Sequence, residues 1–288
     1  MKILVTGANG FTGKHFVAYV SNHGHTVHEL ESNLLDIDAL KSEVLSVTPD
    51  AVVHLAAISF VGHKDLSAFY DINVIGTTNL LDALALLPKL PDRILLASSA
   101  HIYGNCDVSP IMETAAPAPV NHYATSKLAM ESMARTYITK LPIFFTRPFN
   151  YIGPNQADFF VIPKLISHFV NKAPSIELGN IDVEREFNDV RFVCDAYLKL
   201  LLSAKVGENY NICSGKAITI RSVINLLSEI TGHTPKITTN PAFVRSNDIE
   251  RLFGDPNKLF NCVGSINIPA LKDTIEWIIS DYQNGIRQ

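Results

Sequence analysis

The segment KILVTGANGFTG, residues 2–13, joins an apolar run directly to three glycines and decides the fold. The run predicts a short buried strand, and the amphipathic residues after Gly13 predict a helix. Gly7 permits the sharp turn between them, Gly10 lets the backbone approach a pyrophosphate, and Gly13 lets the helix pack closely on the strand. Because the triplet lies between a predicted strand and a predicted helix, we expect a dinucleotide site there.

Strands and helices alternate through the first half of the chain. Short apolar and β-branched runs predict strands at Lys2–Thr6, Thr26–Leu30, Ala51–His54, Arg93–Ala97 and Ile143–Arg147. The amphipathic segments between them predict helices near Lys14–His23, Asp38–Val47, Leu66–Leu87 and Tyr123–Thr139. This alternation predicts an α/β fold, a Rossmann-type doubly wound parallel sheet with helices on both faces and right-handed crossovers.

The regular alternation of predicted strands and helices ends after the segment RPFNYIGP, residues 147–154. Proline and glycine punctuate the remainder, with helices predicted near Pro163–Asn171, Phe192–Leu202, Ile220–Thr231 and Leu271–Gln283. We expect residues 1–150 to form an NAD(P)-binding Rossmann domain, to which the chain returns near 187–205. Residues 151–288 are expected to form mainly a smaller α/β lobe that covers the C-terminal edge of the sheet and binds the substrate.

The composition argues against several classes of function. The chain has 288 residues, 47% of them hydrophobic, and a net charge of −4 without a cluster of Lys or Arg, so no basic face for nucleic acid is expected. Four widely spaced cysteines indicate reduced thiols and neither a metal site nor a disulfide framework. No run approaches the roughly 18 apolar residues of a membrane span, and the residues before the first strand are too few for a signal peptide. We expect a soluble cytoplasmic protein.

The residues after the second predicted strand bear on which dinucleotide binds. A carboxylate at Glu31 can accept hydrogen bonds from both ribose hydroxyls of NAD and would repel the 2′-phosphate of NADP. No arginine occurs before Arg93, so no guanidinium is at hand for that phosphate. The sequence favours NAD(H), and NADP(H) stays possible if Glu31 is solvated and Ser32 and Asn33 accommodate a phosphate. Asp36 is predicted to contact adenine or, alternatively, to cap a helix.

A tyrosine and a lysine open the fourth predicted helix of the first half. In YATSK, residues 123–127, the i, i+4 spacing places the phenol of Tyr123 and the ammonium of Lys127 on one face. The ammonium and the positive charge of an oxidised nicotinamide favour the phenolate, which brings the pKa of the tyrosine down from near 10 toward a working range. Ser99, just past the strand that ends at Ala97, is placed to share a carbonyl or hydroxyl oxygen with Tyr123. We predict these three side chains as catalytic, with Lys127 also holding the nicotinamide ribose.

These motifs resemble those of the extended short-chain dehydrogenases, specifically the nucleotide-sugar epimerases, dehydratases and reductases. The resemblance rests on GANGFTG (7–13), HLAA (54–57), SSAHIYG (98–104), YATSK (123–127) and RPFNYIGP (147–154), and it extends to REFNDV (185–190) and GDP (254–256). Within that family, Phe149-Asn150 followed by GPNQ (153–156) is most similar to the GDP-6-deoxy-4-keto-mannose reductases.

The resemblance implies an NAD(P)-dependent enzyme whose substrate is a nucleotide-diphosphate sugar. The predicted cofactor contacts are Gly7, Gly10, Phe11, Thr12, Gly13, Glu31, Asp36, Leu55, Ala56, Ala57, Asn73, Tyr123 and Lys127. The resemblance further implies that Asn150 contacts the sugar nucleotide and that Asp248 lies near the nucleoside. Arg185 and Arg245 would neutralise the diphosphate, unless each forms a surface ion pair. A homodimer is also implied, joined by a four-helix bundle of the predicted helices at residues 66–87 and 123–139.

The residues after the strand-end serine distinguish the reactions of this family. Its dehydratases place Asp-Glu, or at least Glu, directly after that serine or threonine, whereas here Ala100 and His101 follow. Alanine has no proton to give, so dehydration is not expected. The role of His101 stays open among a hydrogen bond to the sugar, an acid/base role and space filling.

The favoured function is therefore a reductase. We predict an NAD(P)H-dependent 4-keto reductase of a 4-keto-6-deoxy nucleotide sugar, with a GDP-linked substrate favoured, the hydride from nicotinamide and the proton from Tyr123. A nucleotide-sugar 4-epimerase with transient hydride transfer to tightly bound NAD is the alternative. A non-catalytic dinucleotide-binding sensor is a more remote one.

Overall fold

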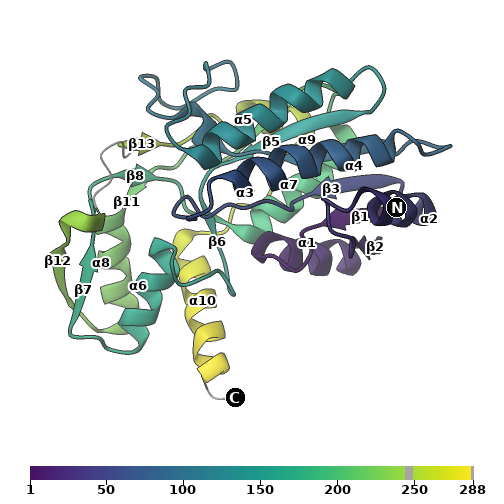
Figure 1. Ribbon diagram of the computed structural model, residues 1–288. Coiled ribbons are helices and arrows are strands. Elements are labelled where there is room, and N and C mark those ends of the chain that lie inside the picture. The colour runs from purple at the N-terminus through teal and green to yellow at the C-terminus, as the bar shows by residue number, and fades with distance from the viewer. Residues whose placement is uncertain (244–248, 287–288) are drawn as a thin grey trace.

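The computed structural model describes residues 1–243 and 249–286 and shows a larger lobe built on a central sheet, with a smaller lobe beside it (Figure 1). The sheet has six parallel strands in the order β10-β5-β4-β3-β1-β2. The strands are β1 (Lys2–Thr6), β2 (Thr26–Glu29), β3 (Ala51–His54), β4 (Arg93–Ala97), β5 (Ile143–Pro148) and β10 (Asn209–Ile212). The strand order reverses between β1 and β3, so the predicted Rossmann-type fold is confirmed.

Side chains alternate along the strands and fill two cores, one on each face of the sheet. Ile3 and Val5 of β1 belong to the core under α1 (Phe11–Asn22) and α7 (Val190–Ser203). Leu4 between them belongs to the opposite core. The helices over that second face are α2 (Ile37–Val47), α4 (Thr77–Leu84) and α5 (His122–Ala134). Because both faces are covered, the strands read as nearly continuous apolar runs, which explains their clear signal in the sequence.

One strand of the central sheet comes from the C-terminal half of the chain. β10 pairs in parallel with β5 at the sheet edge, with Asn211 beside Arg147. The helix α9 (Asn257–Val263) then packs on α7 and β10. The sequence predicts a return to the larger lobe near 187–205, and the structure extends that return through β10 and α9. The sequence of β10, NYNI at residues 209–212, mixes polar and apolar residues. It therefore lacks the apolar or β-branched run that marks the other strands of this sheet in the sequence.

The smaller lobe packs three helices and several short strands around its own core, which includes Leu165, Val223 and Ile275. Its helices are α6 (Val161–Val170), α8 (Ile220–Thr231) and α10 (Leu271–Ile286). Its strands pair as β7 (Ser175–Leu178) with β12 (Lys236–Thr239), β8 (Glu184–Arg185) with β11 (Ile218–Thr219) and β13 (Arg251–Leu252), and β6 (Tyr151–Ile152) with β9 (Asn188–Asp189). In the parts of the chain that the structure describes, no helix is long and apolar enough to cross a lipid bilayer.

The helix predicted over Leu66–Leu87 is interrupted. It consists of α3 (Ser67–Tyr70), a π-helical turn (Asp71–Gly76) and α4. The π-turn places the buried Asn73 against the loop after β3, where its side chain bonds both backbone groups of Ile58 and the hydroxyl of Ser126 on α5. These contacts between segments far apart in the chain produce a turn that helical periodicity does not encode.

Candidate active site

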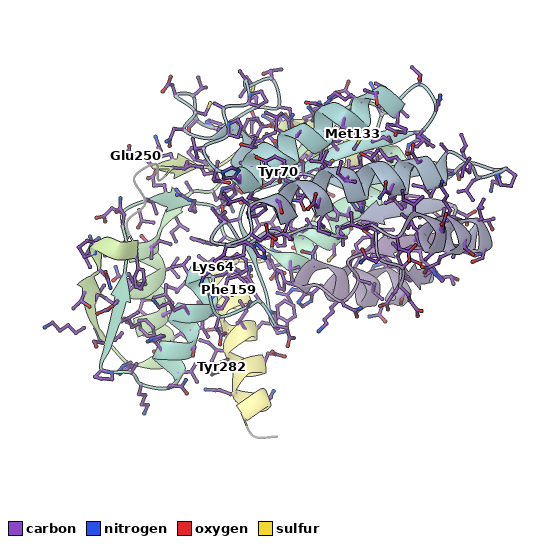
Figure 2. The ribbon with its side chains drawn as sticks, viewed as in Figure 1. Lys64, Tyr70, Met133, Phe159, Glu250 and Tyr282 are labelled. Atoms are coloured by element: carbon purple, nitrogen blue, oxygen red, sulfur yellow. The ribbon has the colours of Figure 1, made fainter. Side chains whose placement is uncertain are left out.

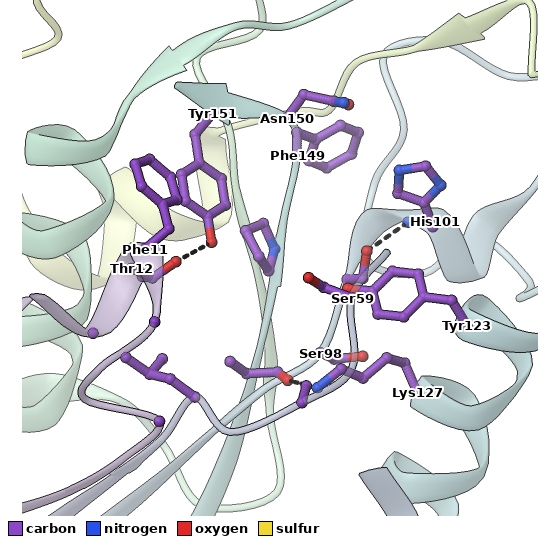
Figure 3. Close-up of a pocket in the computed structure, with 18 of the residues that line it drawn as sticks. Phe11, Thr12, Ser59, Ser98, His101, Tyr123, Lys127, Phe149, Asn150 and Tyr151 are labelled. Carbon is purple, nitrogen blue, oxygen red and sulfur yellow. Dashed lines mark hydrogen bonds between the residues drawn. The ribbon is translucent and has the colours of Figure 1, made fainter. Parts of the chain in front are cut away.

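A cavity of about 270 Å³ opens at the carboxyl edge of the sheet, where doubly wound folds bind their ligands. Its walls come from the glycine turn, the segments that follow β3, β4 and β5, and the start of α5. The lining residues are Gly7, Gly10, Phe11, Thr12, Gly13, Leu55, Ala57, Ser59, Ala97, Ser98, Ser99, His101, Tyr123, Lys127, Pro148, Phe149, Asn150, Tyr151, Gln156, Phe160 and Tyr197. Figure 3 shows Thr12 and Tyr151 on one wall, with Tyr123 and Lys127 across from them.

The glycine turn is closed by contacts that leave no room for side chains. Gly7 has a φ of +68°, and a Cβ placed on it would lie 2.7 Å from the backbone nitrogen of Ala56. A Cβ on Gly13 would lie 2.2 Å from the carbonyl oxygen of Gly7. Contacts this short exclude larger residues and leave bare backbone at the N-terminus of α1. This cradle fits the pyrophosphate of a dinucleotide.

A buried histidine fixes the loop that follows β3. His54 Nδ1 lies 2.7 Å from Thr6 Oγ1, and its Nε2 lies 2.8 Å from Thr77 Oγ1. Thr77 donates its own proton to the carbonyl oxygen of Asn73, so Nε2 of His54 donates and Nδ1 accepts. Burial, with the charge of Lys127 adding to it, lowers the pKa of His54 to about 3. The imidazole therefore stays neutral and ties β1, β3 and α4 together beneath the cavity.

Ser99, Tyr123 and Lys127 all line the cavity, and Figure 3 shows Tyr123 and Lys127 on the wall across from Thr12. α5 begins just before the tyrosine because Asn121 caps it, its Oδ1 accepting a backbone N–H of the first turn at 2.9 Å. One turn further along, Lys127 Nζ donates to the carbonyl oxygen of Ala97 at 2.7 Å. The end of β4 and the first two turns of α5 thus bring the three side chains to one place.

Burial favours the neutral form of the Tyr123 phenol. Burial raises the pKa of Tyr123 above its usual 10.0, and a hydrogen bond with Ser99 offsets only part of that rise. The sequence predicts the opposite, a lowered pKa for Tyr123, because of the positive charges of Lys127 and of an oxidised nicotinamide. In the protein alone burial prevails, because desolvation disfavours the phenolate. A neutral phenol is the form that can donate a proton to a carbonyl oxygen.

The ammonium of Lys127 belongs to a buried network of charges behind the cavity. Burial lowers the pKa of Lys127 to about 8, and the carboxylate of Glu131 offsets part of that shift. Glu131 forms a buried bidentate pair with Arg147 of β5, with N–O distances of 2.7 and 3.0 Å. Arg147 also donates to the hydroxyl of Tyr103 at 2.9 Å. No local pattern predicts this network, because Arg147 and Tyr103 lie far along the chain from Lys127 and Glu131.

The turn after β4 carries Ala100 and His101. Ala100 is fully buried, whereas His101 lines the cavity. The imidazole meets the ring of Tyr123 edge-on, with 6.0 Å between the ring centroids. The backbone N–H of His101 donates to Ser99 Oγ at 3.2 Å. His101 is therefore adjacent to the phenol of Tyr123, where it can hydrogen-bond a bound molecule.

Several residues predicted to contact the cofactor lie outside the cavity walls. Glu31 is exposed, just past the end of β2. Asp36 caps α2 by accepting a backbone N–H at 3.1 Å, the alternative that the sequence left open. Ala56 donates its backbone N–H to Thr6 Oγ1 at 3.2 Å beneath the loop. Asn73 is buried and bonded to the loop after β3, so it positions residues that line the cavity.

The residues predicted to contact the sugar nucleotide fall in three places. Asn150 lines the cavity, and its Oδ1 is buried with no hydrogen-bond partner among the described residues. Arg185 is nearly buried outside the cavity and donates to backbone carbonyls of β8 and of the segment before β13. Arg245 and Asp248 lie outside the described residues.

The sequence analysis missed Tyr151 and Gln156, which follow β5 and enter the cavity from the smaller lobe. The hydroxyl of Tyr151 lies 2.6 Å from Thr12 Oγ1, and its ring stacks on Phe11. Gln156 donates to the carbonyl oxygen of Tyr151 at 3.2 Å. Its Oε1, like Ser98 Oγ, is buried without a hydrogen-bond partner among the described residues. Tyr151 lies shortly after the end of β5, a position that could have marked it, whereas no local pattern indicates that Gln156 reaches the cavity.

Comparison with known proteins assigns the family. Residues 3–213 match the model described as the NAD dependent epimerase/dehydratase family. The chain belongs to this family. The matched segment runs from β1 to the end of β10 and includes the glycine turn and α5, so the resemblance inferred from the sequence is confirmed.

Two curated enzymes and a solved structure are similar to this chain over both lobes. The chain is 38% identical to GDP-6-deoxy-D-talose 4-dehydrogenase of Aggregatibacter actinomycetemcomitans, with 92% of each chain covered. It is 36% identical to GDP-6-deoxy-D-mannose reductase of Pseudomonas aeruginosa, with 100% of this chain and 99% of the relative covered. The solved structure of RMD from Pseudomonas aeruginosa complexed with NADPH superposes with a TM-score of 0.91 at 35% identity and covers 99% of both chains.

Replacing Tyr123 by phenylalanine tests the role of the phenol. Tyr123→Phe keeps the ring against His101 and removes only the proton donor, so we expect turnover to fall by about 10²-fold or more. The dissociation constant of the dinucleotide, measured by fluorescence quenching, should change by less than about twofold. Tyr137→Phe is the control, because that hydroxyl bonds Asp82 on the surface. A Tyr123→Phe variant with wild-type kcat would contradict the assignment.

The lowered pKa of Lys127 predicts a pH dependence of dinucleotide binding. Below about pH 8 the ammonium is present and can hold a ribose, and above it the charge is lost. We therefore expect affinity for the dinucleotide, titrated from pH 6.5 to 9.5, to fall as pH rises, with a midpoint near 8. In Lys127→Met the affinity should be weaker throughout and nearly independent of pH in that range. An affinity that stays constant across it in the wild type would exclude this role.

Proposed function

We propose that the protein is an NAD(P)H-dependent 4-keto reductase of a GDP-linked 4-keto-6-deoxy sugar. One observation argues against dehydration: in the described parts of the chain, no Asp or Glu lines the cavity. Elimination of water from a sugar needs carboxyl groups as acid and base, whereas hydride transfer needs only one positioned proton donor. The full-length similarity to two enzymes named for GDP-6-deoxy-hexoses supports the substrate class.

The chain's own residues supply everything in the proposed reaction except the hydride. The bound dinucleotide supplies the hydride to C4 of the sugar. Tyr123 donates its proton to the C4 oxygen, so the ketone becomes an alcohol and the phenol becomes a phenolate. Ser99 hydrogen-bonds the same oxygen, and Lys127 stabilises the phenolate and holds the ribose. His101 is proposed to hydrogen-bond the sugar from its place beside the phenol.

The sugar nucleotide is proposed to lie between the two lobes. Asn150 supports this, since its buried Oδ1 is an acceptor without a partner among the described residues and can receive a sugar hydroxyl. Arg185 and Arg245 keep their proposed role at the diphosphate, and Asp248 at the nucleoside. The glycine turn and the loop after β3 are proposed to hold the dinucleotide on the other side.

We also propose that the protein is a cytoplasmic homodimer. α3 and α4 lie beside α5 on the same outer layer, where Figure 2 labels Tyr70 and Met133. Ile75, in the π-turn between α3 and α4, has half of its surface exposed. Two such helical layers can pair as a four-helix bundle. The cysteines are free thiols, as suits a reducing compartment.

An assay with defined sugars distinguishes the reductase from the epimerase. The enzyme is incubated with GDP-4-keto-6-deoxy-mannose and NADH or NADPH, in parallel with dTDP-, UDP- and CDP-linked 4-keto sugars. We expect stoichiometric oxidation of the dinucleotide with the GDP-linked substrate, and NMR of the product then gives the configuration at C4. In a further incubation with a 4-hydroxy sugar nucleotide, conversion into its C4 epimer without net oxidation or reduction of the dinucleotide would instead show an epimerase. Binding without any turnover would indicate the sensor.

Substitution at Ile75 tests the dimer. We expect the wild type to sediment at twice the 31.7 kDa mass of the chain, and Ile75→Glu, which places a charge in the proposed bundle, to sediment as a monomer at micromolar concentration. Leu202→Glu is the control, because Leu202 is an exposed leucine on α7 away from these helices. A wild type that stays monomeric, or an Ile75→Glu variant that stays dimeric, would contradict the proposal.

A further inference from the structure

The loop after β2 is tied down by a carboxylate from the neighbouring helix. Glu43 lies on α2, and its Oε1 accepts the backbone N–H of Glu31 at 3.0 Å. Its Oε2 accepts the backbone N–H of Ser32 at 2.8 Å. The ring of His28, on β2, adds a contact of 2.8 Å between Nε2 and Oε1. One carboxylate therefore occupies two consecutive backbone donors at the start of this loop.

The hydrogen-bond partners of Glu43 hold it in its anionic form. Burial by itself would raise its pKa, but hydrogen bonds from Ser32, Glu31 and His28 lower the pKa of Glu43 to about 2. Glu31 is a second carboxylate, exposed at the same place. The loop thus presents negative charge and no vacant backbone donor at residues 31 and 32.

This loop lies beside the glycine turn. The backbone N–H of Leu30 donates to the carbonyl oxygen of Val5 at 2.9 Å, so Glu31 comes level with the turn that follows β1. In a doubly wound fold this is the place of the adenosine ribose. A 2′-phosphate there needs a guanidinium or vacant N–H groups. The first arginine of the chain, Arg93, starts β4 and therefore lies at the opposite edge of the parallel sheet.

We infer that Glu43 makes the dinucleotide site select NAD(H) over NADP(H). The carboxylate occupies the donors that a 2′-phosphate would use and repels the phosphate by its charge. The ribose hydroxyls of NAD(H), which are donors, still find an acceptor in Glu31. The inference rests on the proposed function, because it presupposes a dinucleotide at the glycine turn.

The test is the ratio of two dissociation constants, Kd(NADPH)/Kd(NADH), measured by calorimetry on the dimer or monomer as purified. Glu43→Gln keeps the size and one acceptor oxygen but removes the charge. We expect the ratio to fall by about tenfold, because NADPH binds more tightly while NADH changes by less than about threefold. Asp38→Asn is the matched control: it removes the same charge from an exposed position on the same helix, and it should leave the ratio within twofold.

A second measurement needs no variant. If charge repulsion weakens NADPH binding, the wild-type ratio should fall as ionic strength rises from about 0.02 to 0.3 M, because salt screens exposed charges. A ratio that is unchanged in Glu43→Gln, or that falls equally in Asp38→Asn, overturns the inference while leaving the proposed function intact. A wild type that binds NADPH as tightly as NADH also overturns the inference alone. A wild type that binds neither dinucleotide overturns both.

Discussion

The contact between Gly13 and Gly7 is the constraint on which the rest of the site depends. A Cβ on Gly13 would lie 2.2 Å from the carbonyl oxygen of Gly7, so α1 can start this close to β1 only without that side chain. The close start brings Phe11 and Thr12 to the cavity, where both meet Tyr151 of the smaller lobe. The absence of a side chain at Gly13 therefore shapes the phosphate cradle and also allows the contact between α1 and Tyr151 of the smaller lobe.

Burial governs the chemistry of the opposite wall. It raises the pKa of Tyr123 and lowers that of Lys127, so both groups are held toward their neutral forms. The nearby carboxylate of Glu131 supports the charge on Lys127, and Arg147 in turn compensates Glu131. A buried ion pair is stabilising only when its geometry is good, and the bidentate contact between Arg147 and Glu131 meets that condition. The contact between Arg147 of β5 and Glu131 of α5 thus bears on the charge of Lys127 as well as on the fold.

Reductases, epimerases and dehydratases share the residues that serve hydride transfer, so the additional acid and base side chains in the site distinguish these three classes of enzyme. Ala100 is buried where a dehydratase would need an acid, and the described cavity wall has no carboxylate to replace it. His101 is, with Ser99, a polar neighbour of the phenol. Its imidazole can hydrogen-bond a sugar at a site where the proton donor is already present.

The sequence by itself determined β1 to β5, the glycine turn and the pairing of Tyr123 with Lys127. Each is specified by residues close together in the chain, through a short apolar run, a tight turn or an i, i+4 spacing. Only the tertiary structure decided that NYNI forms β10, that Asn73 sits in a π-turn, and that Gln156 enters the cavity. It also decided the direction of the pKa shift of Tyr123 and brought Glu43 to the loop after β2. These features depend on burial and on contacts between distant segments, which no local pattern of residues contains.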